Sequence, residues 1–140
     1  MAADVCGHAD AGATALREAK YAWAGQLRAS GDRDQALKFY KELASDVKTR
    51  EGSEAAYYVI EALFESGDLD KTESEVFAFS DREPIAYWLA KAFLLLGDVY
   101  VRKGDTFQAR ATYQSVADGY SPADDGIVDE AKERIAKLKN

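Results

Sequence analysis

The chain has 140 residues, a formal net charge of −7 at pH 7 and a pI near 4.7. Its lysine and arginine residues are dispersed among acids, which argues against a nucleic-acid partner because phosphate binding depends on clustered cations. No run approaches the ~18 apolar residues of a membrane-spanning helix, and residues 1–14 lack the basic start and apolar stretch of a secretory signal. These features predict a soluble chain without a membrane span, in the cytoplasm or the periplasm, and leave the compartment unknown.

Apolar residues recur with the period of a helix from about residue 12 onward, and no segment alternates as a strand would. We therefore expect an all-α fold, with a flexible N-terminal segment at residues 1–11 and a single domain at residues 12–140. The expected helices cover about residues 12–30, 33–47, 52–66, 69–80, 84–103, 106–119 and 122–138.

Three Gly-Asp pairs separate consecutive helices, and their glycines lie 36 and 37 residues apart. Glycine adopts the left-handed conformation that ends a helix, and the aspartate behind it can cap the next helix. A small residue five positions after each glycine lets the second helix lie close to the first. The pairs with these small residues are Gly31-Asp32 with Ala36, Gly67-Asp68 with Thr72, and Gly104-Asp105 with Ala109.

Larger apolar residues stand at fixed offsets from each glycine and put one apolar stripe on each helix. Four and eight residues before the glycines they are Leu27, Leu63 and Tyr100, then Trp23, Val59 and Leu96. Nine and twelve residues after the glycines they are Tyr40, Val76 and Tyr113, then Leu43, Phe79 and Val116. A helix-turn-helix unit repeated at this period is typical of a repeat array, so we expect Trp23, Leu63, Leu96 and Tyr100 to be buried.

The chain resembles the tetratricopeptide repeat family, most closely from Phe93 to Tyr113. The resemblance implies a right-handed α-solenoid of three helix-turn-helix repeats, at about residues 14–49, 50–84 and 85–121. Residues 122–138, with Ser121 as cap and Pro122 in the first turn, would form a capping helix with Ile127, Ala131 and Ile135 on its apolar face. No such polar cap precedes the first repeat, and the chain resembles the C-terminal segment of a larger bacterial array.

In this family the first helix of each repeat lines a concave groove that binds peptides. The groove residues expected here combine aromatic side chains with both signs of charge, which suits peptide recognition. They are Tyr21, Arg28, Tyr57, Glu61, Phe64, Glu65, Lys91, Leu94, Asp98 and Arg102. Relatives that bind the acidic tails of heat-shock chaperones use a clamp of Lys, Asn and Arg side chains. In this chain only Lys91 falls at a clamp position, so chaperone-tail binding is not expected.

Two function classes follow, and an enzyme is not expected. The first is a non-catalytic adaptor whose groove binds a peptide or protein segment. The second is a structural or oligomerisation module that stacks through its N-terminal face, where Leu16, Ala22 and Trp23 are expected to be open and to give weak self-association. No cofactor is expected, and no metal either, because tetrahedral zinc needs four ligands and Cys6 and His8 are the only Cys and His.

Overall fold

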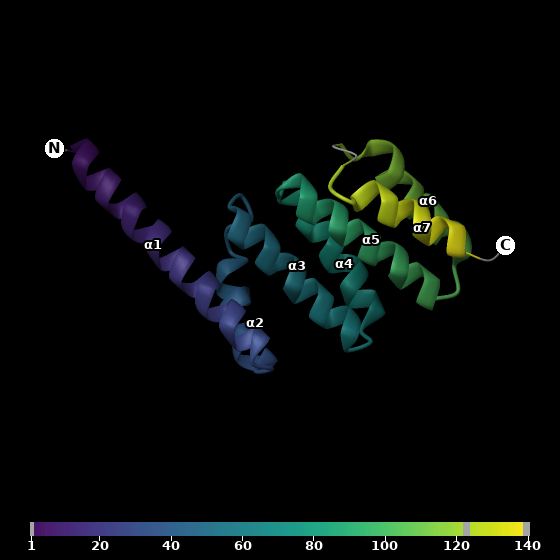
Figure 1. The fold of residues 1–140 in the computed structure, drawn as a ribbon, viewed down its shortest axis with the longest axis horizontal. Helices are drawn as coiled ribbons and strands as arrows, with labels where there is room; N and C mark the ends of the chain where they lie inside the picture. Colours follow the sequence, from purple (N-terminus) through teal and green to yellow (C-terminus); the bar gives the residue numbers. More distant parts are fainter. Residues whose placement is uncertain (1, 122–123, 139–140) are drawn as a thin grey trace.

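The computed structural model describes residues 2–121 and 124–138, with side chains from residue 11 onward. Throughout this part of the chain the regular structure is helical, which confirms the all-α helical repeat fold (Figure 1). The helices are α1 (Ala2–Ala29), α2 (Arg33–Leu43), α3 (Arg50–Glu65), α4 (Leu69–Asp81), α5 (Ala86–Arg102), α6 (Thr106–Gly119) and α7 (Ile127–Lys137).

Consecutive helices pack in pairs, α1 with α2, α3 with α4, and α5 with α6, and each pair packs on the next. The odd-numbered helices also contact one another in order, α1 with α3, α3 with α5, and α5 with α7, so that they run side by side across the molecule (Figure 1). Polar contacts between the repeats join residues about one repeat apart. Arg17 bonds to Glu51 34 positions away, and Arg134 bonds to Asp98 36 positions away.

The Gly-Asp turns have the predicted geometry. Gly31, Gly67 and Gly104 have φ values of +89°, +89° and +79°. Each following aspartate accepts a hydrogen bond from the backbone N–H three residues on, which satisfies one of the unpaired donors at the helix start. The distances are 3.3 Å from Gln35 N to Asp32, 3.2 Å from Lys71 N to Asp68, and 3.0 Å from Gln108 N to Asp105.

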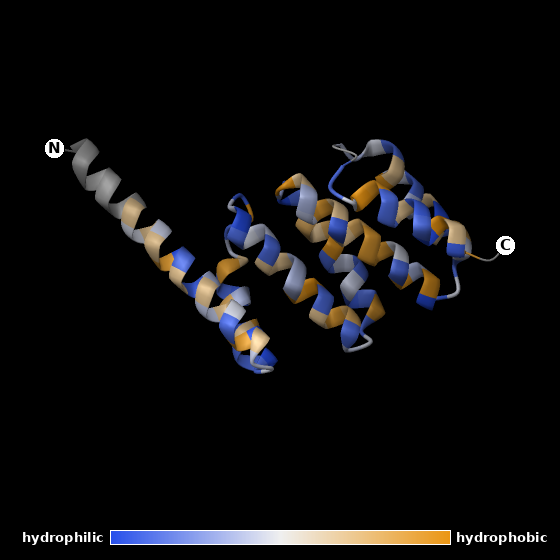
Figure 2. Ribbon diagram, viewed as in Figure 1, coloured by the Kyte–Doolittle hydropathy of each residue, from blue (hydrophilic) through white to orange (hydrophobic). Residues whose placement is uncertain are grey.

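Helix α5 is the centre of the core, as its nearly uniform apolar sequence predicts. It contacts α3, α4, α6 and α7, and hydrophobic residues follow much of its length (Figure 2). Leu94, Leu95 and Leu96 are buried, and Gly97 lets α6 approach so closely that a methyl group on this glycine would lie 2.2 Å from Tyr113 Cε1. The close packing of α6 on α5 therefore depends on the absence of a side chain at Gly97, opposite Tyr113.

Three helix boundaries differ from prediction by two residues or more at the N-terminal side of the molecule, and one of them is the end of α2, at Leu43 instead of residue 47. Helix α1 begins at Ala2, although residues 1–11 were expected to be flexible, because this alanine-rich segment contains no proline and alanine favours helix. Helix α3 begins at Arg50 instead of residue 52, because Thr49 accepts a hydrogen bond from Gly52 N at 3.0 Å and caps the helix there.

The capping helix α7 also begins later than predicted, at Ile127 instead of residue 122. Gly126 precedes it with a φ of +90°, and Asp125 accepts a hydrogen bond from Ile127 N at 3.2 Å. Ser121 is therefore not the cap, and Pro122 lies outside the described residues. The apolar face of α7 is nevertheless the predicted one, since Ile127 and Ala131 are buried and Ile135 is half-buried.

Burial at the N-terminal end was predicted wrongly for Trp23. Its side chain is 59% exposed and stacks on Phe39 at a centroid distance of 5.5 Å. Leu96 occupies the same place in the third repeat and is buried, because further helices cover α5 there. Leu63, also expected to be buried, is half-buried. Repeat position alone therefore does not decide burial; the neighbouring helix does.

Candidate functional site

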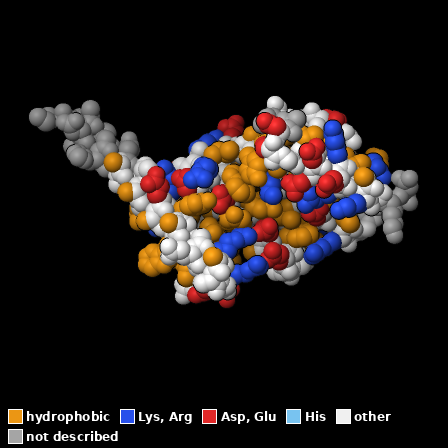
Figure 3. All heavy atoms as spheres, viewed as in Figure 1, with side chains coloured by type: hydrophobic (Ala, Val, Ile, Leu, Met, Phe, Trp, Pro, Cys, Tyr) orange, Lys and Arg blue, Asp and Glu red, His pale blue; other side chains and the backbone are white. Residues whose placement is uncertain are grey.

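The candidate site is the first-helix face, the surface formed by α1, α3, α5 and α7. Hydrophobic side chains gather over the middle of the molecule between rims rich in charged groups (Figure 3). On this face most of the predicted groove residues come from α3 and α5, which pack directly on each other. The face is therefore built from side chains of successive repeats.

A chain of rings crosses the interface between repeats. Tyr40 lies 5.0 Å from Tyr58, Tyr57 lies 5.6 Å from Trp88, and Tyr87 lies 4.9 Å from Trp88, measured between ring centroids. Tilted and edge-to-face arrangements at these distances are the favourable ones for aromatic pairs. The aromatic cluster fixes rigid apolar area between α2, α3 and α5.

Three cations lie over rings of α3. Arg28 of α1 lies 3.9 Å from the centroid of the Tyr58 ring. From the other side, Lys91 and Arg102 of α5 lie 5.8 Å from the Tyr57 ring and 4.1 Å from the Phe64 ring. Contacts of this kind contribute about 0.5–1 kcal/mol at exposed sites. They therefore favour the observed positions of the three cations over the rings.

Every carboxylate of α3 accepts a hydrogen bond or forms an ion pair. Those of Glu51, Glu61 and Glu65 meet Arg17 at 3.1 Å, Arg28 at 3.5 Å and Arg33 at 3.2 Å. Glu54 accepts the Tyr21 hydroxyl at 2.9 Å and 2.8 Å.

The single carboxylate of α5 is also paired. Asp98 accepts hydrogen bonds from Tyr113 at 2.5 Å and from Arg134 at 3.1 Å, and this joins α5 to both α6 and α7.

The tyrosines of the face remain protonated donors at neutral pH. Burial, followed by the hydrogen bond to Glu54, raises the pKa of Tyr21 to about 12. Burial also raises the pKa of Tyr57 well above its ordinary value, and the nearby Glu61 adds to this. Both hydroxyls thus donate to carboxylates and are not candidates for base or nucleophile chemistry.

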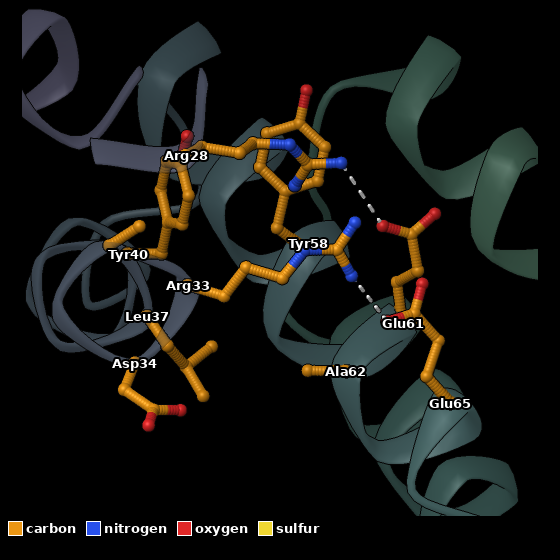
Figure 4. Close-up of a pocket in the computed structure, with 10 residues that line it drawn as sticks. Arg28, Arg33, Asp34, Leu37, Tyr40, Tyr58, Glu61, Ala62 and Glu65 are labelled. Atoms are coloured by element: carbon orange, nitrogen blue, oxygen red, sulfur yellow. Dashed lines mark hydrogen bonds and ion pairs between the residues drawn. The ribbon is translucent and has the colours of Figure 1, made fainter. Parts of the chain in front are cut away.

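A cavity of about 200 Å³ opens at the α1 end of the face, between α2 and α3 (Figure 4). Leu37 and Ala62 line it together with the Tyr40 and Tyr58 rings. Arg28 and Arg33 reach toward Glu61 and Glu65, with the ion pairs drawn as dashed lines in Figure 4. The lining is therefore apolar and aromatic, with four charged groups in two ion pairs and a further carboxylate from Asp34.

Two of the predicted groove residues are corrected by their burial. Tyr57 is 8% exposed because α5 packs Trp88 and Lys91 onto its ring, and Leu94 is 2% exposed because it belongs to the core. The remaining residues keep half-buried or exposed side chains on this face; they are Tyr21, Arg28, Glu61, Phe64, Glu65, Lys91, Asp98 and Arg102.

Sequence reasoning missed three contributors to the site. Tyr40 was expected on an apolar stripe, and Trp88 and Arg33 were not among the expected groove residues. Tyr40 packs on Tyr58, Trp88 packs on Tyr57, and Arg33 pairs with Glu65. The available signal was the density of aromatic residues near the start of α5, where Tyr87 and Trp88 are adjacent.

The described part of the chain contains no group of three or more His, Cys, Asp or Glu side chains placed to hold a metal ion. The side chains of Cys6 and His8 lie outside the described ones. None of the helices described is both long and apolar enough to cross a membrane.

Comparison with known proteins gives one family match. The family model described as tetratricopeptide repeat matches residues 91–121, which span most of α5 and all of α6. No curated protein matches the chain. The two earlier Gly-Asp turns share the φ values and caps of the matched segment, so the same local geometry occurs three times.

Proposed function

We propose that this chain, which is a tetratricopeptide repeat protein, binds a segment of another protein on its first-helix face. Repeats of this family generally mediate protein–protein interaction and are not catalytic. The chain would accordingly act as a non-catalytic adaptor without a cofactor.

One observation carries the proposal: the first-helix face holds partly exposed rings and cations together in fixed positions. Tyr58 and Phe64 are half-buried, and each supports an arginine over its ring. Rigid aromatic area and arginine are the features that dominate binding hot spots, and rings in mutual contact lose little entropy when a ligand covers them.

The cavity beside Arg28 supports the same reading. Its volume of about 200 Å³ suits one apolar side chain of a partner, surrounded by the Arg28–Glu61 and Arg33–Glu65 ion pairs. These pairs are exposed and contribute about 0–1 kcal/mol each, so a ligand can displace them at low cost. Buried apolar contact inside a polar rim is the usual anatomy of an interface.

The test is to select peptides from a random library on the intact chain and to map their binding by NMR. Backbone amide shifts should cluster on α3 and α5 and in the Arg28 to Tyr40 region. Exposed Phe107, which is 84% exposed on α6, offers a control variant: Phe107→Ser should leave binding unchanged. Selected peptides whose shifts map to α4 and α6 alone would contradict the proposal.

The N-terminal face supports a second candidate function, a structural module that stacks on more repeats or on a second copy. Leu16 is 57% exposed and Trp23 is 59% exposed, so α1 leaves apolar area uncovered. Light scattering over a concentration series should then show weak association that Leu16→Glu abolishes and Phe107→Glu does not. Association that is absent, or equally sensitive to both variants, would rule out this face.

A further inference from the structure

We propose that the cavity beside Arg28 takes a lysine side chain of the bound segment, with the lysine ammonium group at the Asp34 carboxylate. The inference rests on the proposed function and adds the chemistry of one side chain of the partner. It follows from the charges that line the cavity and from a comparison of the first two repeats.

The charged groups that line the cavity leave one carboxylate without a partner. Two arginines and three acids line it, and the Arg28–Glu61 and Arg33–Glu65 pairs, at 3.5 Å and 3.2 Å, account for four of these groups. The fifth is the Asp34 carboxylate, which has no hydrogen bond or ion pair with any described residue. Figure 4 shows both arginine side chains extended toward the acids of α3, whereas Asp34 lies on the α2 side. The cavity therefore offers an acceptor to an incoming cation, and the net charge of −7 attracts cations to the chain as a whole.

The second repeat shows how an aspartate at this position is satisfied. Asp70 has the same place in α4 as Asp34 has in α2, three residues after the turn glycine. The Asp70 carboxylate accepts a hydrogen bond from Lys103 Nζ at 2.6 Å, and this bond joins α4 to the end of α5 in the next repeat. A lysine ammonium is therefore the partner that the molecule itself supplies to the equivalent carboxylate.

The corresponding lysine is missing beside Asp34. Lys103 directly precedes the turn glycine of its repeat, and the residue with this place at the end of α3 is Ser66. The short Ser66 side chain donates to Leu63 O of its own helix at 2.7 Å, and no described residue donates to the Asp34 carboxylate. The place of the ammonium is thus left to a ligand.

The rest of the lining suits the stem of a lysine. Leu37 and Ala62 contribute apolar groups and Tyr40 and Tyr58 contribute rings, around a volume of about 200 Å³. A lysine buries its methylene stem along such a surface and keeps its charged head in water, where the exposed Asp34 lies. A ligand glutamate in the same position would meet the Asp34 carboxylate instead and would be repelled by it.

The first test uses random peptide libraries of about ten residues, long enough at about 3.3 Å per residue to cross α2, α3 and α5, with a lysine fixed in the middle. The tightest binder is made again with norleucine, which keeps the stem and removes the charge, and with glutamate. Fluorescence anisotropy should show about two- to fivefold weaker binding for norleucine, the effect of one exposed charge pair, and a larger loss for glutamate. In NMR spectra the lysine peptide should shift the signals of Asp34 and Leu37. Equal affinity for lysine and norleucine, or a lysine peptide that leaves these signals unshifted, overturns the inference.

The second test removes the carboxylate from the protein. Asp34→Asn should weaken the lysine peptide about two- to fivefold and should leave the norleucine peptide unchanged. Asp129→Asn removes the same charge from the first turn of α7, at the other end of the stack, and should leave both affinities unchanged. Circular dichroism of each variant checks that it is folded.

The third test supplies the missing lysine within the chain. Ser66→Lys places an ammonium where the next repeat has Lys103, so it should compete for Asp34 and weaken the lysine peptide about two- to fivefold. Ser74→Lys adds the same charge at an exposed serine of α4, whose hydroxyl also bonds to a backbone carbonyl three residues back, and should leave the affinity unchanged. Equal effects of the two lysines would contradict a specific site at Asp34.

The two proposals fail in different ways. If the lysine and norleucine peptides bind equally and their shifts cover α3 and α5, the cavity takes no cation and the interaction face stands. If Asp129→Asn weakens binding as much as Asp34→Asn, the attraction is one of overall charge, and the lysine inference is overturned. If the shifts map to α4 and α6 alone, the proposed function itself is wrong.

Discussion

Helices α1 and α5 occupy the same place in their repeats but differ in what covers them. In α1, Leu16 and Trp23 are more than half exposed, whereas in α5 Leu94, Leu95 and Leu96 are buried. Among the described residues, helix α1 is covered by α2 and α3 alone, and α5 is covered by α3, α4, α6 and α7. The comparison shows that the repeat sequence determines the helices and turns, while position in the stack determines which apolar residues contribute to stability.

The largest expected effect separates the two leucines. Leu96→Ala should lower the free energy of unfolding by about 2–5 kcal/mol, because it removes buried methyl groups and leaves a cavity. Leu16→Ala removes the same atoms from an exposed site and should change stability by less than about 0.5 kcal/mol. Urea denaturation measures both; comparable losses would mean that α1 is covered in solution.

A second prediction concerns two helical glycines with opposite surroundings. Gly97→Ala should destabilise by about 1–3 kcal/mol, because the new methyl group meets the buried Tyr113 ring. Gly25→Ala in α1 meets nothing within 4 Å and should stabilise by about 0.5–1 kcal/mol through helix propensity. Thermal melts of both variants should therefore shift in opposite directions. Shifts of the same sign would show that the close approach of α5 and α6 is relaxed.

The smallest expected effect depends on pH. Glu73 accepts the Tyr100 hydroxyl at 2.6 Å and Lys103 Nζ at 3.1 Å, and these bonds lower the pKa of Glu73 below its ordinary value of 4.5. A lowered pKa in the folded state adds stability above pH 4.5 that is lost as the pH falls through the folded pKa.

Glu73→Gln should therefore flatten the loss of stability in acid, by at most about 1 kcal/mol, in urea titrations between pH 3 and pH 7. Glu42→Gln removes the same charge from the wider Lys20–Glu42 pair of the first repeat, at 3.7 Å, and provides the matched control for net charge. Equal flattening by both variants would assign the effect to overall charge.

The sequence predicted local features well because their causes are local. A glycine with positive φ and the aspartate that caps the next helix act within a few residues, and Gly31, Gly67 and Gly104 all follow this rule. The start of α7 was predicted wrongly because two local signals compete there. The pair Ser121-Pro122 looks like a helix start, but Gly126 ends the preceding loop in a left-handed conformation closer to the helix.

Contacts between repeats could not be predicted from the sequence. Trp23 and Leu96 have the same offset from their glycines, and only the neighbouring helix decides that one is exposed. At the candidate site, the sequence identified Arg28 and Arg102 equally well. Which of them has a carboxylate partner depends on how α1, α3 and α5 align in space.

The spacing of the contacts between repeats has a mechanical consequence. In the described part of the chain no helix contact skips a repeat; α1 reaches α3 and α3 reaches α5, but α1 does not reach α5. Each interface between neighbouring repeats therefore contributes separately to stability, and these contributions add along the chain. A ligand that contacts both α3 and α5 stabilises the interface between them and leaves the stability of the α1–α3 interface unchanged. The N-terminal repeat could then unfold and refold while such a ligand remains bound.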